Sequence, residues 1–406
     1  MIEKSAISVL IVDDEPFMLK LLARMLENLG FSHVTTCDNA RIALDCIVSP
    51  SGAPDLILSD LNMPEMDGIE FVRKLVERHY AGSLILVSGE SERVLHSAEK
   101  LVHAHGITVL GRLHKPFTHD GLAALLATWE PPSRTDSRAT KKSYGADEVR
   151  AAITNGQLVN YYQPKVVVAT GEVMGVETLV RWRHPVDGMV FPEEFIGVAE
   201  AHGMIDDLTR LVLTGALAQS KVWKQAGLVL WVAVNVSMDN LTSLDFPDIV
   251  AGLAARAGVP PQSVTLEVTE SRLMQDTRVA LEILTRLRMK RFGLSIDDFG
   301  TGNSSLAQLR DIPFGELKID RSFVHGAGTN ATIRAIYDAS LGLAKQLGME
   351  VVAEGVEDRD DWDFVHGTGC DLSQGYFIAK PMPAGDLPRW METWHEWVRS
   401  GFPARA

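Results

Sequence analysis

The chain has 406 residues, more than one ordinary hydrophobic core serves, which predicts two domains or a small domain joined to a barrel. Its 46% hydrophobic and 23% charged residues exclude the disordered, collagen-like and membrane-embedded classes. The net charge of −14 repels a phosphate backbone, and no basic helix or stripe offsets it, so we expect no nucleic-acid binding.

The three cysteines, Cys37, Cys46 and Cys370, are scattered and show no C-x-x-C spacing. This pattern argues against a zinc site and fits a reducing compartment, so we expect all three to be buried core thiols.

The sequence has no run of 18 apolar residues and no signal-peptide pattern. We therefore expect a cytoplasmic protein without a membrane span.

Short apolar runs alternate with helix-length amphipathic segments in the first part of the chain. The runs are V-L-I-V at 9–12, L-I-L at 56–58, L-I-L-V at 84–87 and I-T-V-L at 107–110. This alternation predicts a doubly wound, flavodoxin-like parallel sheet in a domain over 1–130. A stretch rich in proline, serine and basic residues predicts a linker over 131–146, followed by a second domain over 147–406.

Polar residues follow the predicted strands of the first domain, at ends that are neighbours in a parallel sheet. They are Asp13, Asp14, Asp60, Ser88 and Lys115. Crowded carboxylates repel one another, and Mg²⁺ relieves that repulsion while leaving an oxygen free for a phosphoryl group. Isolated Asp-Asp and Asp-Gly pairs are usually helix caps or turns, but five ordered residues favour a phosphoryl site.

Four motifs mark the first domain. They are I-V-D-D-E at 11–15, S-D-L-N-M-P-E-M-D-G at 59–68, V-S-G at 87–89 and H-K-P-F at 114–117. With them, residues 7–127 resemble the receiver domain of response regulators. The resemblance implies that Asp60 accepts phosphate from a sensor histidine kinase.

The same resemblance assigns the other pocket residues of the receiver. It implies that Asp13 and Asp14 hold Mg²⁺, and that Ser88 and Lys115 contact the phosphoryl group. The family usually carries an aromatic switch residue three positions before the lysine. Arg112 stands there in this chain, which puts the conventional serine–aromatic switch in doubt.

A short helix predicted at 147–157 opens the second domain, and between 161 and 383 several strand-like runs lead into helical segments. These runs end in a polar or charged residue: Glu177, Asn235, Glu267, Asp297, Lys318, Glu354 and Gln374. A (β/α)₈ barrel collects the C-terminal ends of its strands on the face where active sites lie. We therefore predict a TIM-barrel-like fold with all seven side chains at one pocket.

The acids of the second domain offer oxygen ligands, which select Mg²⁺ or Mn²⁺ over zinc. A first ion would take Glu177, Asn235, Glu267 and Asp297, and a second would take Asp298 and Glu354. Two such ions activate a water and neutralise a leaving oxygen, as phosphodiester hydrolysis requires. Lys318 and Arg181 add fixed positive charge. A single such carboxylate more often forms a salt bridge, but their joint occurrence favours a metal centre.

The second domain carries a longer series of motifs. They are Y-Q-P at 162–164, E-T-L-V-R-W at 177–182, N-V-S at 235–237, E-V-T-E at 267–270, D-D-F-G-T-G at 297–302, L-K-I-D-R-S-F-V at 317–324, A-E-G-V-E at 353–357 and Q-G-Y at 374–376. With them, residues 149–390 resemble the EAL phosphodiesterases, and the whole chain resembles receiver–EAL response regulators. The resemblance implies hydrolysis of cyclic di-GMP to linear pGpG.

Carried over by motif, the resemblance gives Glu354 as the candidate general base, with Lys318 and Asp298 assisting. It implies substrate contacts for Gln163, Arg181 and Gln374. It also implies that Glu270 supports the loop over 297–305, which we expect to move. Two departures, E-T-L in place of E-A-L and Asn303 in place of tyrosine, remove no ligand.

Regulation and assembly follow from the two resemblances taken together. Phosphorylation of Asp60 is expected to modulate turnover through the contacts of an EAL homodimer or larger homo-oligomer. Two other hypotheses about the function of the chain stay open. One is a non-catalytic cyclic di-GMP receptor that signals through protein contacts, and the other is a phosphorylation-dependent scaffold.

Overall fold

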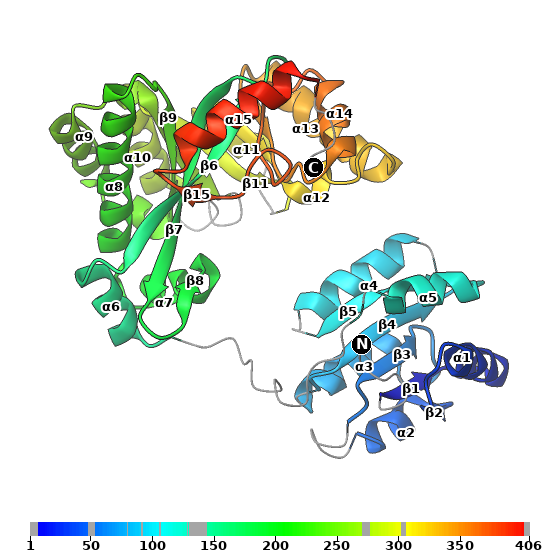
Figure 1. Cartoon of the computed structure of the whole chain (residues 1–406). Coiled ribbons are helices and arrows are strands. Elements are labelled where there is room, and N and C mark those ends of the chain that lie inside the picture. The colour runs from blue at the N-terminus through cyan, green and yellow to red at the C-terminus, as the bar shows by residue number, and fades with distance from the viewer. Residues whose placement is uncertain are drawn as a thin grey trace. The chain divides into compact units, whose positions relative to one another are not determined.

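The computed structural model describes most of the chain. The described residues are 7–47, 53–78, 80–90, 92–104, 107–127, 129, 144–269, 277–301 and 306–401. The chain divides into two compact units, 1–140 and 141–406 (Figure 1). Among the described helices, none has the length and apolar character needed to cross a membrane.

The first unit is a five-stranded sheet in the order β2-β1-β3-β4-β5, and every pairing in it is parallel. The strands are β1 (Ser8–Val12), β2 (His33–Cys37), β3 (Leu56–Asp60), β4 (Ser83–Ser88) and β5 (Thr108–His114). This confirms the doubly wound sheet that the apolar runs predict.

Helices cover both faces of this sheet (Figure 1). They are α1 (Pro16–Asn28), α2 (Ala40–Asp45), α3 (Gly68–Glu77), α4 (Glu92–Ala104) and α5 (His119–Ala127). Successive side chains of a strand point to opposite faces, so Leu10 packs in the core under α2, α3 and α4, whereas Ile11 packs under α1 and α5. Burial on both faces explains why the strands read as continuous apolar runs.

The second unit is an eight-stranded barrel, as predicted. Its strands are β6 (Leu158–Val167), β7 (Val173–His184), β9 (Trp231–Val236), β10 (Val264–Thr269), β11 (Gly293–Phe299), β12 (Glu316–Ile319), β13 (Glu350–Ala353) and β14 (Leu372–Ser373). The sheet closes because β6 pairs with both β7 and β14, and both pairings are antiparallel. A regular barrel has only parallel strands. Here the turn at 168–172 joins β6 directly to β7, and a short connection of that kind allows only an antiparallel pair.

Two short strands, β8 (Gly188–Val190) and β15 (Met382–Pro383), extend the barrel sheet. The helices are α6 (Ala146–Thr154), α7 (Ile196–Ala201), α8 (Ile205–Gln225), α9 (Phe246–Ala257), α10 (Thr277–Met289), α11 (Leu306–Asp311), α12 (Arg321–Val324), α13 (Ala331–Gln346), α14 (Arg359–His366) and α15 (Leu387–Arg399). Helix α6 matches the predicted helix at 147–157 with slightly earlier ends. Most of the predicted linker lies outside the described residues, so the domain boundaries stay predictions.

The cysteines correct one expectation. Cys37 and Cys370 are buried, as predicted for core thiols, but Cys46 is exposed. Helix α2 has only six residues, and Cys46 caps its C-terminal end. The sequence pattern did not reveal how short this helix is.

Candidate active site and phosphorylation site

The acidic pocket of the first unit forms at the C-terminal edge of its sheet. Strands β1 and β3 pair in register up to Val12 and Ser59, so the residues that follow, Asp13 and Asp60, are neighbours. Carboxylate oxygens of Asp13, Asp14 and Asp60 all lie within 4.8 Å of one another. Asp13 and Asp60 are buried, and this grouping suits one hard divalent cation such as Mg²⁺.

Lys115 compensates part of this negative charge. Its Nζ lies 2.8 Å from Asp13 Oδ2 and 2.7 Å from Asp60 Oδ2. Burial favours the neutral amine, but hydrogen bonds to both carboxylates raise the pKa of Lys115 overall. Burial also raises the pKa of Asp13. One lysine faces three carboxylates, so the pocket keeps an excess of negative charge for a cation.

Ser88 lies at the same edge. Val87, the residue before it, pairs with Asp60, and the Ser88 carbonyl accepts a hydrogen bond from the Lys115 amide at 2.8 Å. The five predicted pocket residues are therefore neighbours.

Arg112, at the position of the usual aromatic residue, places its Nε 3.2 Å from Glu99 Oε2 and so links β5 to α4.

In the barrel, strand pairing brings the predicted ligands together. Glu177 on β7 pairs with Gln163 on β6, and Glu267 on β10 pairs with Asn235 on β9. Asp297 on β11 pairs with Thr269 of β10. Contrary to expectation, Glu177 and Glu267 lie within their strands and not at the ends. The ligand set therefore reaches down into the barrel, beyond its rim.

Lys318 on β12 occupies the centre of the cluster. Its Nζ lies 2.7 Å from Glu354 Oε1, 3.0 Å from Asp297 Oδ1, 3.2 Å from Glu267 Oε2 and 3.5 Å from Glu177 Oε2. The side chain is buried. Burial favours its neutral form, but the surrounding acids raise the pKa of Lys318 well above its usual value. It is a permanent cation that holds four acids around one point.

A chain of side-chain amides holds Glu177 from the other side. Asn235 Nδ2 donates to Glu177 Oε1 at 2.7 Å, and Gln374 Nε2 donates to Glu177 Oε2 at 2.7 Å. Gln374 Nε2 also donates to Gln163 Oε1 at 2.9 Å, and Gln163 Nε2 donates to the Ala379 carbonyl at 2.9 Å. These three side chains fix the orientation of the Glu177 carboxylate.

Asp297 and Asp298 both reach the cluster because β11 is irregular there. Side chains of successive strand residues normally alternate, but the pairing with β12 shifts between Ile296 and Phe299 and Asp298 has a left-handed φ of 56°. Oxygens of Asp297, Asp298 and Glu354 lie within 4.8 Å of one another. Burial, aided by the Asp297 charge, raises the pKa of Asp298 to about 6. This group suits a second cation.

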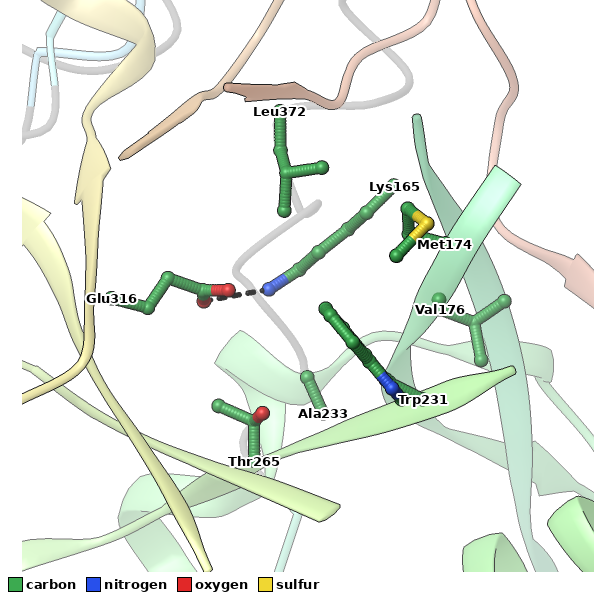
Figure 2. Close-up of a pocket in the computed structure, with 9 residues that line it drawn as sticks. Lys165, Met174, Val176, Trp231, Ala233, Thr265, Glu316 and Leu372 are labelled. Carbon is green, nitrogen blue, oxygen red and sulfur yellow. Dashed lines mark hydrogen bonds and ion pairs between the residues drawn. The ribbon is translucent and has the colours of Figure 1, made fainter. Parts of the chain in front are cut away.

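The sequence analysis did not predict a second buried lysine, which contacts the acid cluster around Lys318. Lys165 Nζ on β6 lies 2.7 Å from Glu267 Oε1 and 3.0 Å from Glu316 Oε1. Figure 2 shows the Lys165 side chain directed at Glu316, with Leu372 and Trp231 among its neighbours. Burial would raise the pKa of Glu267, but the charges of Lys165 and Lys318 lower it to about 2.

The alternation of side chains along a strand could have predicted Lys165 and Glu316 as site residues. Lys165 stands two residues after Gln163, and Glu316 stands two residues before Lys318, so each shares a strand face with a predicted site residue. Glu267, which has no exposed surface, thus accepts a hydrogen bond from one lysine at each carboxylate oxygen. We expect these two hydrogen bonds to fix the geometry of Glu267 as a ligand.

Replacing Lys165 by methionine should destabilise the barrel by about 3 kcal/mol, because removing one partner leaves buried charge unpaired. Urea unfolding measures the loss. The matched control is the double variant Lys165→Met with Glu316→Gln, which removes one negative charge as well and should be less destabilised. Equal stability of wild type and Lys165→Met would contradict the interpretation of this ion pair.

The acids exceed the lysines in this cluster. Five carboxylates pair with the two buried lysines: Glu177, Glu267, Asp297, Glu316 and Glu354. A sixth, Asp298, has an oxygen within 4.8 Å of those of Asp297 and Glu354. Gln374 Oε1 is buried and has no hydrogen-bond partner. An oxygen-only donor set with surplus negative charge fits Mg²⁺ or Mn²⁺, and the two overlapping acid groups fit two ions.

Arg181 lies on the same strand as Glu177. It follows Glu177 by four residues on β7, so the two side chains share one strand face about 13 Å apart along the strand. Its Nη1 donates to the Val180 carbonyl at 2.9 Å, and its guanidinium carbon lies 5.2 Å from the Phe191 ring centroid and 6.0 Å from that of Tyr161. This arrangement holds a cation next to two aromatic rings.

Glu270 and residues 302–305 lie outside the described residues.

His325, at the C-terminal end of α12, contacts α14. Its Nδ1 lies 2.8 Å from Oδ2 of the buried Asp361, which also accepts hydrogen bonds from the amides of Gly326 and Glu357. The Glu357 amide is three residues from Glu354, so Asp361 supports the loop that carries Glu354. The hydrogen bond to Asp361 raises the pKa of His325.

The His325 charge should stabilise the fold only at low pH. Because its pKa is raised in the folded state, the contribution is full below the unfolded value of about 6.5 and is lost as pH rises through the folded pKa. The ring is half-exposed, so the effect should stay below about 1 kcal/mol. Melting temperatures of wild type and His325→Gln should converge between about pH 5 and pH 8. A constant difference would contradict this assignment.

Comparison with known proteins follows the same two-part division. The response regulator receiver domain model matches residues 9–127, and the EAL domain model matches residues 146–381. The cyclic di-GMP phosphodiesterase RocR of Pseudomonas aeruginosa is 33% identical over 381 residues, covering 93% of this chain and 96% of RocR. MucR of the same organism, a bifunctional diguanylate cyclase and cyclic di-GMP phosphodiesterase, is 39% identical over 241 residues, and this chain spans only 35% of its length.

Solved structures resemble the barrel. The MucR phosphodiesterase in complex with cyclic di-GMP is 39% identical, covers 59% of this chain and 98% of that chain, and gives a TM-score of 0.57. The EAL enzyme Bd1971, bound to cAMP and cyclic di-GMP, is 29% identical, covers 61% of this chain and 68% of that chain, and gives 0.58. With RocR matched over nearly its full length, the chain belongs to the EAL domain family and carries a response regulator receiver domain before the barrel.

Proposed function

We propose that this chain hydrolyses cyclic di-GMP to linear pGpG and that phosphorylation of Asp60 modulates its turnover. The observation that carries the proposal is the buried acid cluster around Lys318, in which two groups of three carboxylates share Asp297. The name of RocR, which is similar over nearly its whole length, supports the substrate. The cyclic di-GMP complex of the related MucR barrel supports a binding site in this fold.

Substrate binding would use positive and aromatic side chains of the barrel. Arg181 offers a fork of donors for a phosphate. The exposed rings of Phe191 and Tyr376 can stack on a guanine base. A cavity of about 450 Å³, lined mainly by apolar side chains between β7, β9, α7 and α8, has the size of a nucleotide-scale site and includes Asn235 in its wall.

The hydrolytic step follows from the linear product, which carries a 5′-phosphate. A water oxygen bonds to phosphorus, the bond from phosphorus to the 3′-oxygen breaks, and the 3′-oxygen gains a proton. Divalent ions held by Glu177, Asn235, Glu267, Asp297, Asp298 and Glu354 would acidify the water and neutralise phosphate charge when bound. Glu354, whose pKa is raised by burial, would accept the proton of the water. Lys318 keeps the acids in place.

Conversion of cyclic di-GMP to pGpG by purified protein with Mg²⁺ or Mn²⁺ tests the proposal. Turnover that is lost in Glu177→Ala and Glu354→Ala would support it. Tight binding without turnover would make the chain a receptor. Absence of both binding and turnover would favour a scaffold in which the barrel has only a structural role.

Phosphorylation should depend on Asp60. With acetyl phosphate and Mg²⁺, wild type should gain one phosphoryl group, and Asp60→Asn should gain none because the acceptor carboxylate is gone. Intact-mass spectrometry makes the comparison, and turnover with and without phosphorylation measures the coupling. Phosphoryl uptake by Asp60→Asn would contradict the assignment.

The proposed phosphate donor is a sensor histidine kinase. Light scattering would test the proposed homo-oligomer.

A further inference from the structure

Two of the three cysteines of the chain meet in the receiver. Cys37 is the last residue of β2 and is 6% exposed, whereas Cys46 caps the C-terminal end of α2 and is exposed. Their sulfur atoms lie 3.9 Å apart. A disulfide bond is about 2.05 Å long, so closing the gap requires an approach of about 2 Å. Side-chain rotation at the end of a short helix can supply such a movement.

The environments of the two thiols differ in the way a reactive pair requires. The exposed Cys46 can meet a dissolved oxidant. Burial, together with the contact to Cys46, raises the pKa of Cys37 to about 12, which keeps its thiol protonated and protected until its partner has reacted. Cys370 provides a contrast, because it is buried in the barrel and its Sγ donates to the carbonyls of Val351 and Leu372.

We propose that Cys37 and Cys46 form an intramolecular disulfide when the protein meets a peroxide. The Cys46 sulfur attacks a peroxide oxygen, the O–O bond breaks, and a sulfenic acid and one water result from hydrogen peroxide. The Cys37 sulfur then attacks the Cys46 sulfur and releases a second water, while the Cys37 thiol gives up its proton. The two thiols lose two electrons and the peroxide gains them.

This disulfide forms next to the phosphorylation pocket. The Cys37 carbonyl accepts a hydrogen bond from the Asp13 amide at 3.2 Å, so the end of β2 helps to hold a carboxylate of the cation site. The new bond ties that strand end to α2, whose Leu44 carbonyl also accepts a hydrogen bond from Arg78, the residue that caps the C-terminal end of α3. Since Asp60 chemistry needs the cation, oxidation slows phosphoryl uptake at least twofold. This second part rests on the proposed phosphorylation of Asp60.

Peptide mapping of the full-length protein tests disulfide formation. Trypsin cuts after Arg41, so the two cysteines fall on separate peptides, 25–41 and 42–73. After treatment with hydrogen peroxide and alkylation of free thiols, the two peptides should appear as one linked species that dithiothreitol separates. Cys46→Ser should lack this species, and Cys370→Ser should retain it. Separate peptides with a sulfinic acid on Cys46, or a Cys46–Cys46 link between two chains, would overturn the proposal.

The effect on phosphorylation is measured separately, with acetyl phosphate as the donor. Reduced wild type reports whether Asp60 accepts phosphate at all, which tests the proposed function alone. Oxidised wild type should then react at half the reduced rate or less, whereas Cys46→Ser should react at the same rate with or without peroxide. Equal rates for reduced and disulfide-linked wild type would overturn the coupling.

Discussion

Replacing Glu354 by glutamine should lower kcat for cyclic di-GMP by about 10³-fold, the middle of the range for loss of a general base. The substitution preserves the shape of the side chain, and the new amide oxygen can still accept the hydrogen bond that Lys318 makes to Glu354 Oε1 at 2.7 Å. Burial raises the pKa of Glu354, which makes its ionised carboxylate a better proton acceptor. The neutral amide keeps the contact to Lys318 but cannot take a proton from water.

The matched control is Glu172→Gln, an exposed position in the turn between β6 and β7 that lies outside the acid cluster. Its kcat should equal that of wild type. The melting temperature of Glu354→Gln should stay close to that of wild type, which separates lost chemistry from lost structure. A Glu354→Gln enzyme with more than a tenth of wild-type kcat would sink the assignment of Glu354 as the base.

Much of the receiver could be predicted from the sequence because its signals are local. The apolar runs marked β1, β3, β4 and β5, since strands buried on both faces carry few polar residues. The five pocket residues lie at or just after the C-terminal ends of these strands, so the topology of a parallel sheet brings them together. The exposure of Cys46 could not be predicted, because it depends on where a helix of six residues ends.

The barrel shows where local signals stop. The spacing of acids and helices indicates a barrel, but the antiparallel direction of β6 depends on a short turn that the repeat pattern does not reveal. Asp298 reaches the acid cluster only because of the irregular pairing of β11, which no alternation predicts. Lys165 and Glu316 could have been found, because each stands two residues from a predicted site residue on the same strand.

Replacing Lys318 by methionine should have the largest effect on stability, about 5 kcal/mol near neutral pH in the absence of divalent ions. Its Nζ lies within 3.5 Å of oxygens of four carboxylates, and removing one partner of a buried charge network leaves the others uncompensated. The variant can relieve this repulsion only by protonating acids, so the pKa values of the acids in the folded state should be higher than in wild type. Raised pKa values in the folded state mean stability that is present at low pH and lost as pH rises.

Urea unfolding followed by tryptophan fluorescence measures this loss in the barrel, because Trp129 is the only tryptophan before residue 182. The matched control is Lys345→Met, which removes a half-exposed lysine paired with Asp371 and should cost at most about 1 kcal/mol. Mg²⁺ or Mn²⁺ should restore part of the stability of Lys318→Met and little of that of Lys345→Met, because a divalent ion can replace the missing charge only inside the acid cluster. Equal losses in the two variants would mean that Lys318 does not hold the four acids together, and the proposed metal site would then lose its main structural support.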